Sequence, residues 1–356
     1  MRFIALLLIT TSSFAQNLTP GFNSQEYREL MHIFAETSLD SSGKYPPYPG
    51  WTRLIRSQEV GLDNLWELWS HTSGKHLICV RGTTMKGESW LENFYAAMVP
   101  AQGTLKLNSS TEFTYDLAQN ERAAVHVGWL LGMSHMALDL DPKIDSLMQA
   151  GVKDLLVMGH SQGGAISYLL TSYLKRKQAK GLLPSDLVIK TYCSAAPKPG
   201  NLFYAYEYES STAGGWSFNV VNPADWVPET PISIQTLNDF TPVNPFIHAK
   251  SAIKKMKFPQ NLVLKRVYKK LDKPTRKAQK NYERYLGKMA SKLIRKSQPE
   301  YLPPAYFTSN HYVRTGQMIV LYPDEKYYEL YPADPNKPFG HHGLGQYLYL
   351  LDQLEK

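Results

Sequence analysis

Residues 154–170, DLLVMGHSQGGAISYLL, place a serine between two glycines directly after an apolar run. A serine at the turn between a buried strand and a helix adopts an unfavourable backbone conformation and exposes its hydroxyl at the carboxyl edge of the sheet. Residues beside such a turn must be small, because a larger side chain would collide with the strand or the helix. Gly159, Gly163 and Gly164 meet this requirement. The pattern therefore predicts that Ser161 is a nucleophile.

A serine hydroxyl attacks only when a histidine takes its proton, and a carboxylate must orient that histidine. In chains whose serine occupies such a turn, the acid follows the serine and the histidine comes last. Asp225 lies just past the apolar run WSFNVV, in the proline-bounded loop NPADWVPETP. Aspartate is also a common turn residue, but this position is on the same sheet edge as Ser161. We predict Asp225 as the orienting acid, with Glu229 and Asp239 as alternatives.

Four histidines follow Asp225 in the chain: His248, His311, His341 and His342. The last two directly precede an apolar helical pattern, where a loop can reach over a nucleophile. One of these two is expected to be the base, and we prefer His342.

The negative charge that develops during acyl transfer needs hydrogen-bond donors already in place. The backbone N–H of Gln162, the residue after the nucleophile, is one candidate donor. Thr83, after the apolar run LICVRG, offers both its N–H and its hydroxyl. Arg81 is expected to tie loops together through carboxylates or carbonyl groups. The sequence contains neither a cluster with metal-ligand spacing nor a glycine-rich phosphate loop, so it implies no metal and no cofactor.

Apolar strands alternate with helical patterns along most of the chain, which favours a mostly parallel α/β sheet flanked by helices. The predicted strands are residues 64–69, 75–82, 154–159, 188–196 and 216–221, and the predicted helices are 24–38, the segment after Ser161 and 343–354. Residues 316–331 resemble a hairpin that turns at Pro323–Asp324. Cys79 and Cys193 lie in buried strands and are expected to be free thiols, with one disulfide as the alternative.

The first residues, MRFIALLLITTSSFA, have a basic start, an apolar run and a small-residue exit. This pattern is typical of a signal peptide cleaved after Ala15, although a buried first helix would also be apolar. We therefore expect residues 1–15 to be removed and the chain to be exported, either secreted or periplasmic.

The formal net charge of +8 is unevenly distributed. Residues 250–296 contain thirteen lysines and four arginines but only two acidic residues, Asp272 and Glu283. Pro259 and Pro274 are expected to divide this segment into two or three short helices. Its basic face is either simply solvated or docks on an anionic membrane surface. Nucleic-acid binding is not expected of an exported chain.

These motifs together resemble the class 3 (fungal-type) lipases, which have the α/β-hydrolase fold. The resemblance extends over roughly residues 62–349 and rests on ICVRGTT (78–84), VHVGW (125–129), MGHSQGGA (158–165), SAAPKPGN (194–201), VVNPADWVPETP (220–231) and HHGLGQYL (341–348). It implies an oxyanion role for Thr83, makes Asp225 the catalytic acid and selects His342 as the base.

The chain departs from the family pattern in three places. Gln162 replaces the usual leucine after the nucleophile, Ala195 stands at the first glycine of one motif, and the basic insertion between Asp225 and His342 lies outside the core pattern. The resemblance places residues 85–102 at the family's lid position. The expected organisation is one α/β-hydrolase domain, 16–356, in which residues 241–310 form a basic helical insertion.

The resemblance implies an ester hydrolase, a lipase or esterase, that acts on lipid or other ester substrates through an acyl-enzyme. Two alternatives remain open at this point. One is a lipid acyltransferase with the same catalytic residues, and the other is a catalytically inactive lipid-binding protein that keeps the fold.

Overall fold

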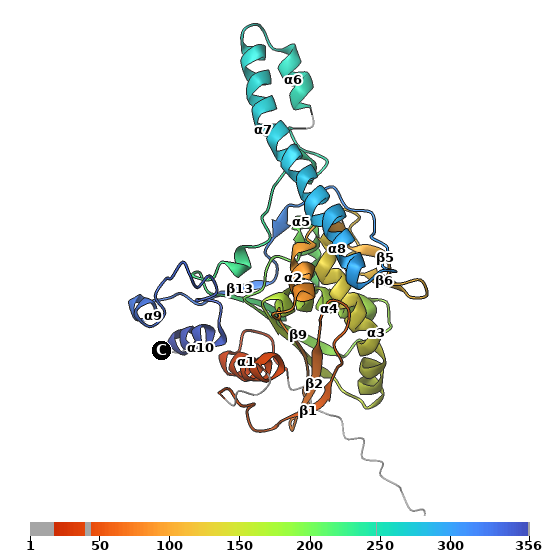
Figure 1. The fold of residues 1–356 in the computed structure, drawn as a ribbon, viewed down its shortest axis with the longest axis vertical. Coiled ribbons are helices and arrows are strands. Elements are labelled where there is room, and N and C mark those ends of the chain that lie inside the picture. Colours follow the sequence, from red (N-terminus) through yellow and green to blue (C-terminus); the bar gives the residue numbers. More distant parts are fainter. Residues whose placement is uncertain (1–17, 40–43, 247, 355–356) are drawn as a thin grey trace, which may run out of the picture.

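The structure is a computed structural model that describes residues 18–39, 44–246 and 248–354. The predicted signal peptide, residues 1–15, lies outside the described residues. A seven-stranded sheet with strand order β1-β2-β3-β8-β9-β11-β13 forms the centre of the molecule (Figure 1). Its strands are β1 (Trp51–Arg56), β2 (Trp66–His71), β3 (His76–Val80), β8 (Asp154–His160), β9 (Val188–Ser194), β11 (Ser217–Val221) and β13 (Gln317–Val320).

Five of these strands, from β3 to β13, run parallel, while β1 and β2 are antiparallel at one edge. Every residue of β8 is buried, as expected of a central strand covered on both faces. The sheet is therefore mostly parallel, as the alternation of strands and helices predicted.

Helices cover both faces of this sheet and create two apolar cores. Leu155 and Val157 of β8 belong to the core shared with α3 (Val127–Gln149) and α4 (Gln162–Ala179). Leu156 and Met158 belong to the core shared with α1 (Ser24–Leu39) and α10 (Leu344–Leu354). This alternation follows from the two-residue period of a strand.

Short elements surround the main sheet. The strands are β4 (Met98–Pro100), β5 (Gln102–Lys106), β6 (Glu112–Asp116), β7 (Ala124–His126), β10 (Gly200–Asn201) and β12 (Tyr312–Val313). The helices are α2 (Gly87–Phe94), α5 (Leu202–Ser211) and α9 (Glu325–Leu330), with the 3-10 turns η1 (Val227–Glu229) and η2 (Leu237–Asp239). Strands β12, β10, β7 and β4 form a second small sheet, and β5 pairs with β6.

The hairpin predicted for residues 316–331 is wrong. Its first half is β13, which pairs in parallel with β11 and closes the edge of the main sheet. Its second half is α9, which begins where the Asp324 side chain accepts a hydrogen bond from the N–H of Tyr327, at 2.7 Å. An aspartate that caps a helix N-terminus thus outweighs the turn tendency of Pro323–Asp324.

The basic segment contains α6 (Ala249–Lys255), α7 (Gln260–Glu283), the π-helical turn η3 (Arg284–Met289) and α8 (Ala290–Ser297). Helices α6 and α7 project away from the sheet (Figure 1). Pro259 precedes α7, but Pro274 lies inside it, so the expected break at Pro274 does not occur. The carbonyl that Pro274 leaves without a donor belongs to the exposed residue Lys270, where water can solvate it.

Both cysteines are buried and free, as predicted. Within the ranges that the structure describes, we find no helix that combines the length and the apolarity needed to cross a membrane.

Candidate active site

Ser161 occupies the turn between β8 and α4 in a strained conformation, with φ 60° and ψ −131°. Its N–H donates to the carbonyl of Ser194 on β9, at 2.9 Å. A Cβ added to Gly159 would lie 2.2 Å from the backbone of Gly163, and one added to Gly163 would lie 2.3 Å from the carbonyl oxygen of Val80. The glycines are therefore required by the close approach of β8, α4 and β3.

Asp225 follows β11 and is buried. Its Oδ2 lies 2.7 Å from Nδ1 of His342 and accepts a hydrogen bond from the Tyr347 hydroxyl at 2.9 Å. Its Oδ1 accepts from the N–H of Val227 at 3.0 Å. The structure thus brings the predicted acid and base into contact, and His342 lines the same cavity as Ser161.

The neighbouring His341 is held elsewhere. Its Nδ1 lies 2.9 Å from the Tyr327 hydroxyl, and its carbonyl accepts from the amide of Asn222 at 3.1 Å. The alternative acid Asp239 accepts hydrogen bonds from Thr236 and Ser309. Asp239 lines a second, smaller cavity to which neither Ser161 nor His342 contributes.

His248, His311 and Glu229 do not join the arrangement of acid and base. His248 and Glu229 are exposed, and His311 lines a different, smaller cavity.

His160, directly before the nucleophile, is a positioning residue that the sequence analysis missed. Its Nε2 lies 2.9 Å from the carbonyl oxygen of His342, and its Nδ1 lies 2.9 Å from the Ser194 hydroxyl. Burial and the neighbouring His342 hold the pKa of His160 well below its usual value. The neutral ring therefore donates from Nε2 to the carbonyl and accepts at Nδ1, which fixes the loop that carries His342.

Tyr347 was also missed, although it stands inside the quoted motif HHGLGQYL. Its hydroxyl accepts from the N–H of Asn222 at 3.2 Å and donates to Asp225. Its place in this motif could have identified it, but a tyrosine at helical spacing is more often a core residue.

The two predicted oxyanion residues touch each other. The Thr83 hydroxyl donates to Oε1 of Gln162 at 2.8 Å and accepts from the amide of Asn93 at 3.0 Å. A hydroxyl has one hydrogen, so in this conformation that hydrogen points at Gln162 and not into the cavity, in contrast to the expectation. The N–H of Gln162 lies in the first turn of α4, where N–H groups have no acceptor within the helix.

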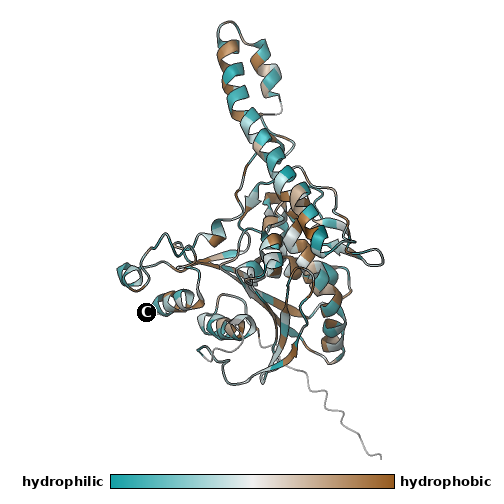
Figure 2. Cartoon of the chain, viewed as in Figure 1, coloured by the Kyte–Doolittle hydropathy of each residue, from teal (hydrophilic) through white to brown (hydrophobic). Residues whose placement is uncertain are grey.

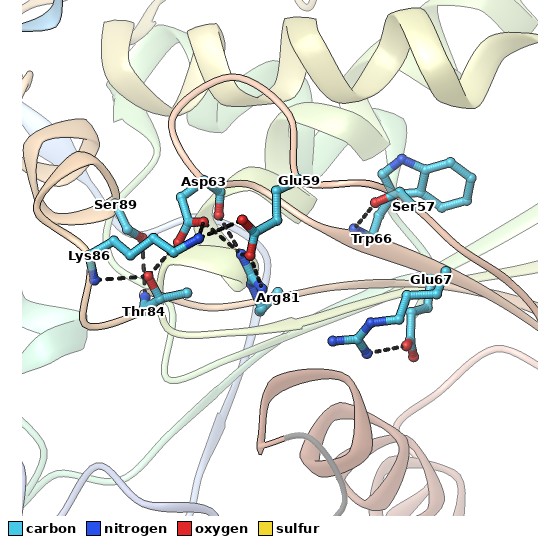
Figure 3. A network of polar contacts seen from close by, with 10 residues as sticks. Ser57, Glu59, Asp63, Trp66, Glu67, Arg81, Thr84, Lys86 and Ser89 are labelled. Carbon is cyan, nitrogen blue, oxygen red and sulfur yellow. Dashed lines mark hydrogen bonds and ion pairs between the residues drawn. The ribbon is translucent and has the colours of Figure 1, made fainter. Parts of the chain in front are cut away.

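A network of charges holds the loop after β3 (Figure 3). Arg81 lies 3.1 Å from Glu59 and donates to the carbonyl of Asp63 at 2.8 Å, while Lys86 lies 2.8 Å from the Asp63 carboxylate. Burial opposes ionisation of Asp63, but hydrogen bonds from Lys86 and Thr84 and the charge of Arg81 keep its pKa below the usual value. Arg81 therefore has the structural role predicted for it.

Helix α2 carries a buried acid, Glu92, beneath the nucleophile turn. Its Oε2 accepts from the amide of Asn64 at 2.6 Å, and the neighbouring Ser89 donates to Oε1 of Gln162 at 3.2 Å. Burial raises the pKa of Glu92 to about 8. The segment expected at the lid position is thus linked to the nucleophile turn by polar contacts.

Ser161 and His342 line a cavity of about 860 Å³ whose walls are mainly apolar and aromatic. This volume is typical of a small-molecule site. The wall side chains include Phe34, Trp90, Phe94, Trp129, Trp226, Ile232, Tyr282, Leu286, Phe339 and Leu344. Several of them, with Met85, remain exposed and give the cavity an apolar rim.

Among the described residues, no group of three or more histidine, cysteine, aspartate or glutamate side chains is arranged to hold a metal ion. The cavity presents the Ser161 hydroxyl and the His342 imidazole, and the Asp225 carboxylate lies buried behind that imidazole. This set of groups suits nucleophilic acyl transfer.

Residues 77–234 match the model of the family described as Lipase (class 3). This part of the chain belongs to the class 3 lipase family. The lipase segment contains Thr83, Ser161 and Asp225, whereas His342 lies beyond its end. The mixed sheet with helices on both faces is an α/β-hydrolase fold.

The chain is also similar to solved lipase structures. One is the lipase Lip2 from Yarrowia lipolytica, with 16% identity, a TM-score of 0.44, and coverage of 61% of this chain and 77% of that one. Another is lipase II from Rhizopus niveus, with 22% identity, a TM-score of 0.43, and coverage of 58% and 74%. A third is a triacylglycerol lipase from Penicillium expansum, with 15% identity, a TM-score of 0.44, and coverage of 59% and 75%. No curated protein matches the chain.

Proposed function

We propose that this chain is a serine ester hydrolase of the lipase type. The observation that carries the proposal is the 2.7 Å contact between Asp225 and His342 at a cavity that Ser161 also lines. The family match over residues 77–234 supports the same activity.

In the proposed reaction, Oγ of Ser161 attacks the ester carbonyl carbon while Nε2 of His342 takes the hydroxyl proton. The backbone N–H groups of Gln162 and Thr83 stabilise the oxyanion. His342 then gives the proton to the leaving alcohol, and the acyl group remains on Ser161. Water, deprotonated by His342, attacks the acyl-enzyme and releases the acid. Asp225 holds the imidazole in the required tautomer throughout.

We propose lipid esters as the substrates because the cavity is apolar. Its aromatic and aliphatic walls can bury an acyl chain, and burial stabilises a chain by about 0.8 kcal/mol per CH₂ group. The exposed apolar rim, which includes Phe94, Ile232 and Phe339, suits contact with an aggregated substrate.

The test is hydrolysis of p-nitrophenyl esters from acetate to palmitate by the wild type and Ser161→Ala. We expect turnover that the substitution lowers by roughly 10³-fold or more, with an unchanged circular dichroism spectrum. The chain-length profile then separates a lipase from an esterase. Equal turnover by the two proteins would refute the nucleophile. No turnover by a folded wild type would favour the inactive lipid-binding alternative, and product formation only with an added alcohol would favour the acyltransferase.

We further propose export through cleavage after Ala15, and contact with an anionic membrane through the basic segment 250–296. Terminal sequencing of the exported protein should begin at Gln16. An exported chain that still begins at Met1 would contradict the cleavage.

A further inference from the structure

Helices α6 and α7 and the loop between them, residues 249–283, form what we call the arm (Figure 1). At 3.6 residues per turn, the residues of α7 separate into two faces. All eight cations of α7 fall on one face: Lys265, Arg266, Lys269, Lys270, Lys273, Arg276, Lys277 and Lys280. The opposite face carries an apolar stripe: Val263, Leu264, Val267, Tyr268 and Leu271. Leu262 lies outside this stripe.

The apolar stripe is largely open to solvent. Val263 is 60% exposed, Val267 48% and Leu271 69%. Helix α6 packs beside α7 on the Tyr268 side, where Nζ of Lys250 lies 5.8 Å from the ring centroid. Figure 2 shows hydrophobic and hydrophilic residues together on this projecting part of the molecule. A row of exposed apolar side chains of this kind is typical of a surface that contacts a membrane or another protein.

The arm is also strongly cationic. It has ten lysines and two arginines, against Asp272 and Glu283. Asp272 pairs with Arg276 of its own helix, and Glu283 lies 2.9 Å from Lys288. In the described part of the chain, neither acid has a further ion pair with a cation of the arm. The surface therefore favours an anionic partner.

The apolar face of α7 leads into the active-site cavity. Tyr282 and Leu286 follow Leu271 by three and four helical turns on the same side of the helix, and both line the cavity with Ser161. The root of the arm is thus a wall of the site. A membrane in contact with the apolar stripe would therefore lie beside the cavity.

We propose that the arm docks the protein on a bilayer that contains anionic phospholipids. Helix α7 lies in the interface, with its apolar stripe against the acyl chains and the cations that border the stripe on the phosphate groups. A basic helix with a separate apolar face has the chemistry for this partner, whereas a second copy of the chain would bring two cationic arms together. Docking itself needs no hydrolysis. The inference rests on the proposed function only where it takes the molecule in the cavity to be a lipid ester.

The test is co-sedimentation of the full chain with phosphatidylcholine vesicles, with and without phosphatidylglycerol. We expect binding only to the anionic vesicles, and weaker binding at high salt. The stripe variant V263S/V267S/L271S and the charge variant K265Q/K270Q/K277Q should each lower the partition coefficient by roughly tenfold or more. The matched control K106Q/K326Q/K337Q removes the same charge from exposed sites outside the arm and should bind like the wild type.

Hydrolysis of p-nitrophenyl acetate reports whether each arm variant is folded, and it should stay within roughly twofold of the wild type because this ester needs no interface. Ser161→Ala should bind the vesicles like the wild type. Binding by all proteins without any ester turnover would leave docking in place and refute the hydrolase.

Equal binding to neutral and anionic vesicles, or unchanged binding by the stripe variant, would overturn the inference. So would a wild-type dimer that the stripe variant converts into a monomer in light scattering, because the stripe would then be an interface between two copies.

Discussion

Asp225 receives hydrogen bonds from His342, from Tyr347 and from the backbone of Val227. Only the bond to His342 belongs to the proposed proton transfer, while the other two orient the carboxylate. His160 fixes the backbone of His342 from the other side. At the scale of single residues, the site is held by supporting side chains as much as by those proposed to react.

Asp225→Asn should therefore lower kcat on a soluble ester by roughly 10³- to 10⁴-fold, because the amide no longer stabilises the required tautomer and charge of His342. Tyr347→Phe is the matched control, since it removes one orienting hydrogen bond and leaves the carboxylate. We expect it to cost less than roughly tenfold. An Asp225→Asn variant with near wild-type kcat would remove Asp225 from the mechanism.

The buried carboxyl group of Glu92 should make the free energy of unfolding depend on pH. Its pKa in the folded state is about 8, above the ordinary 4.5, because burial disfavours the charge. Between these values the unfolded chain releases the proton while the folded chain retains it, so stability decreases as pH rises. The free energy of unfolding should fall by up to roughly 5 kcal/mol from this group.

Urea denaturation between the two pKa values measures this effect. Glu92→Gln should be less sensitive to pH than the wild type, and Glu88→Gln, at an exposed position on the same helix, should behave like the wild type. Identical pH profiles for the wild type and Glu92→Gln would contradict the assignment.

At the scale of elements, the nucleophile turn depends on how closely α4 approaches β3 and β8. Two glycines permit that approach, and the N–H of Ser161 pairs with β9. Helix α2 then joins the same region through Ser89 and Gln162. The strained turn persists because three neighbouring elements hold it.

Gly163→Ala should destabilise the protein by about 1–3 kcal/mol, since its Cβ would meet the carbonyl of Val80 at 2.3 Å. Gly87→Ala is the control, because nothing lies within 4 Å of an added Cβ there. Thermal unfolding followed by circular dichroism measures both. Equal melting temperatures would show that α4 can move away from β3 at little cost.

At the scale of the whole molecule, segments far apart in the sequence build one cavity. The loop after β3, the turn before α4, the loop after β11, the root of the arm and the residues before α10 all contribute walls. The basic segment is therefore part of the site as well as an exposed projection.

Leu286→Trp should shift the ester preference toward shorter acyl chains, because the larger side chain occupies cavity volume at the root of the arm. We expect the ratio of kcat/KM for palmitate over butyrate to fall by roughly tenfold. Leu293→Trp, on the exposed part of α8, should leave the ratio unchanged. An unchanged ratio for Leu286→Trp would place the acyl chain elsewhere.

Local patterns in the sequence were sufficient to predict the sheet class, the nucleophile turn and the candidates Ser161, Asp225 and His342. These features depend on local pattern: an apolar strand, small residues beside a serine, an acid after a strand, and a histidine before the last helix. Local pattern failed at Pro323–Asp324 and at Pro274, where a helix cap and solvation of an exposed backbone outweighed turn and breaker tendencies.

Three features of the site follow from long-range packing: the direction of the Thr83 hydroxyl, the support that His160 gives to His342, and the position of Tyr282 and Leu286 in the cavity wall. Each of these contacts joins segments separated by many residues, so no periodicity or spacing within one segment can show it. The buried state of Glu92 likewise follows from the packing of α2 against α3. Local sequence pattern therefore predicts the candidate reacting groups, whereas contacts between distant segments determine which side chains surround them.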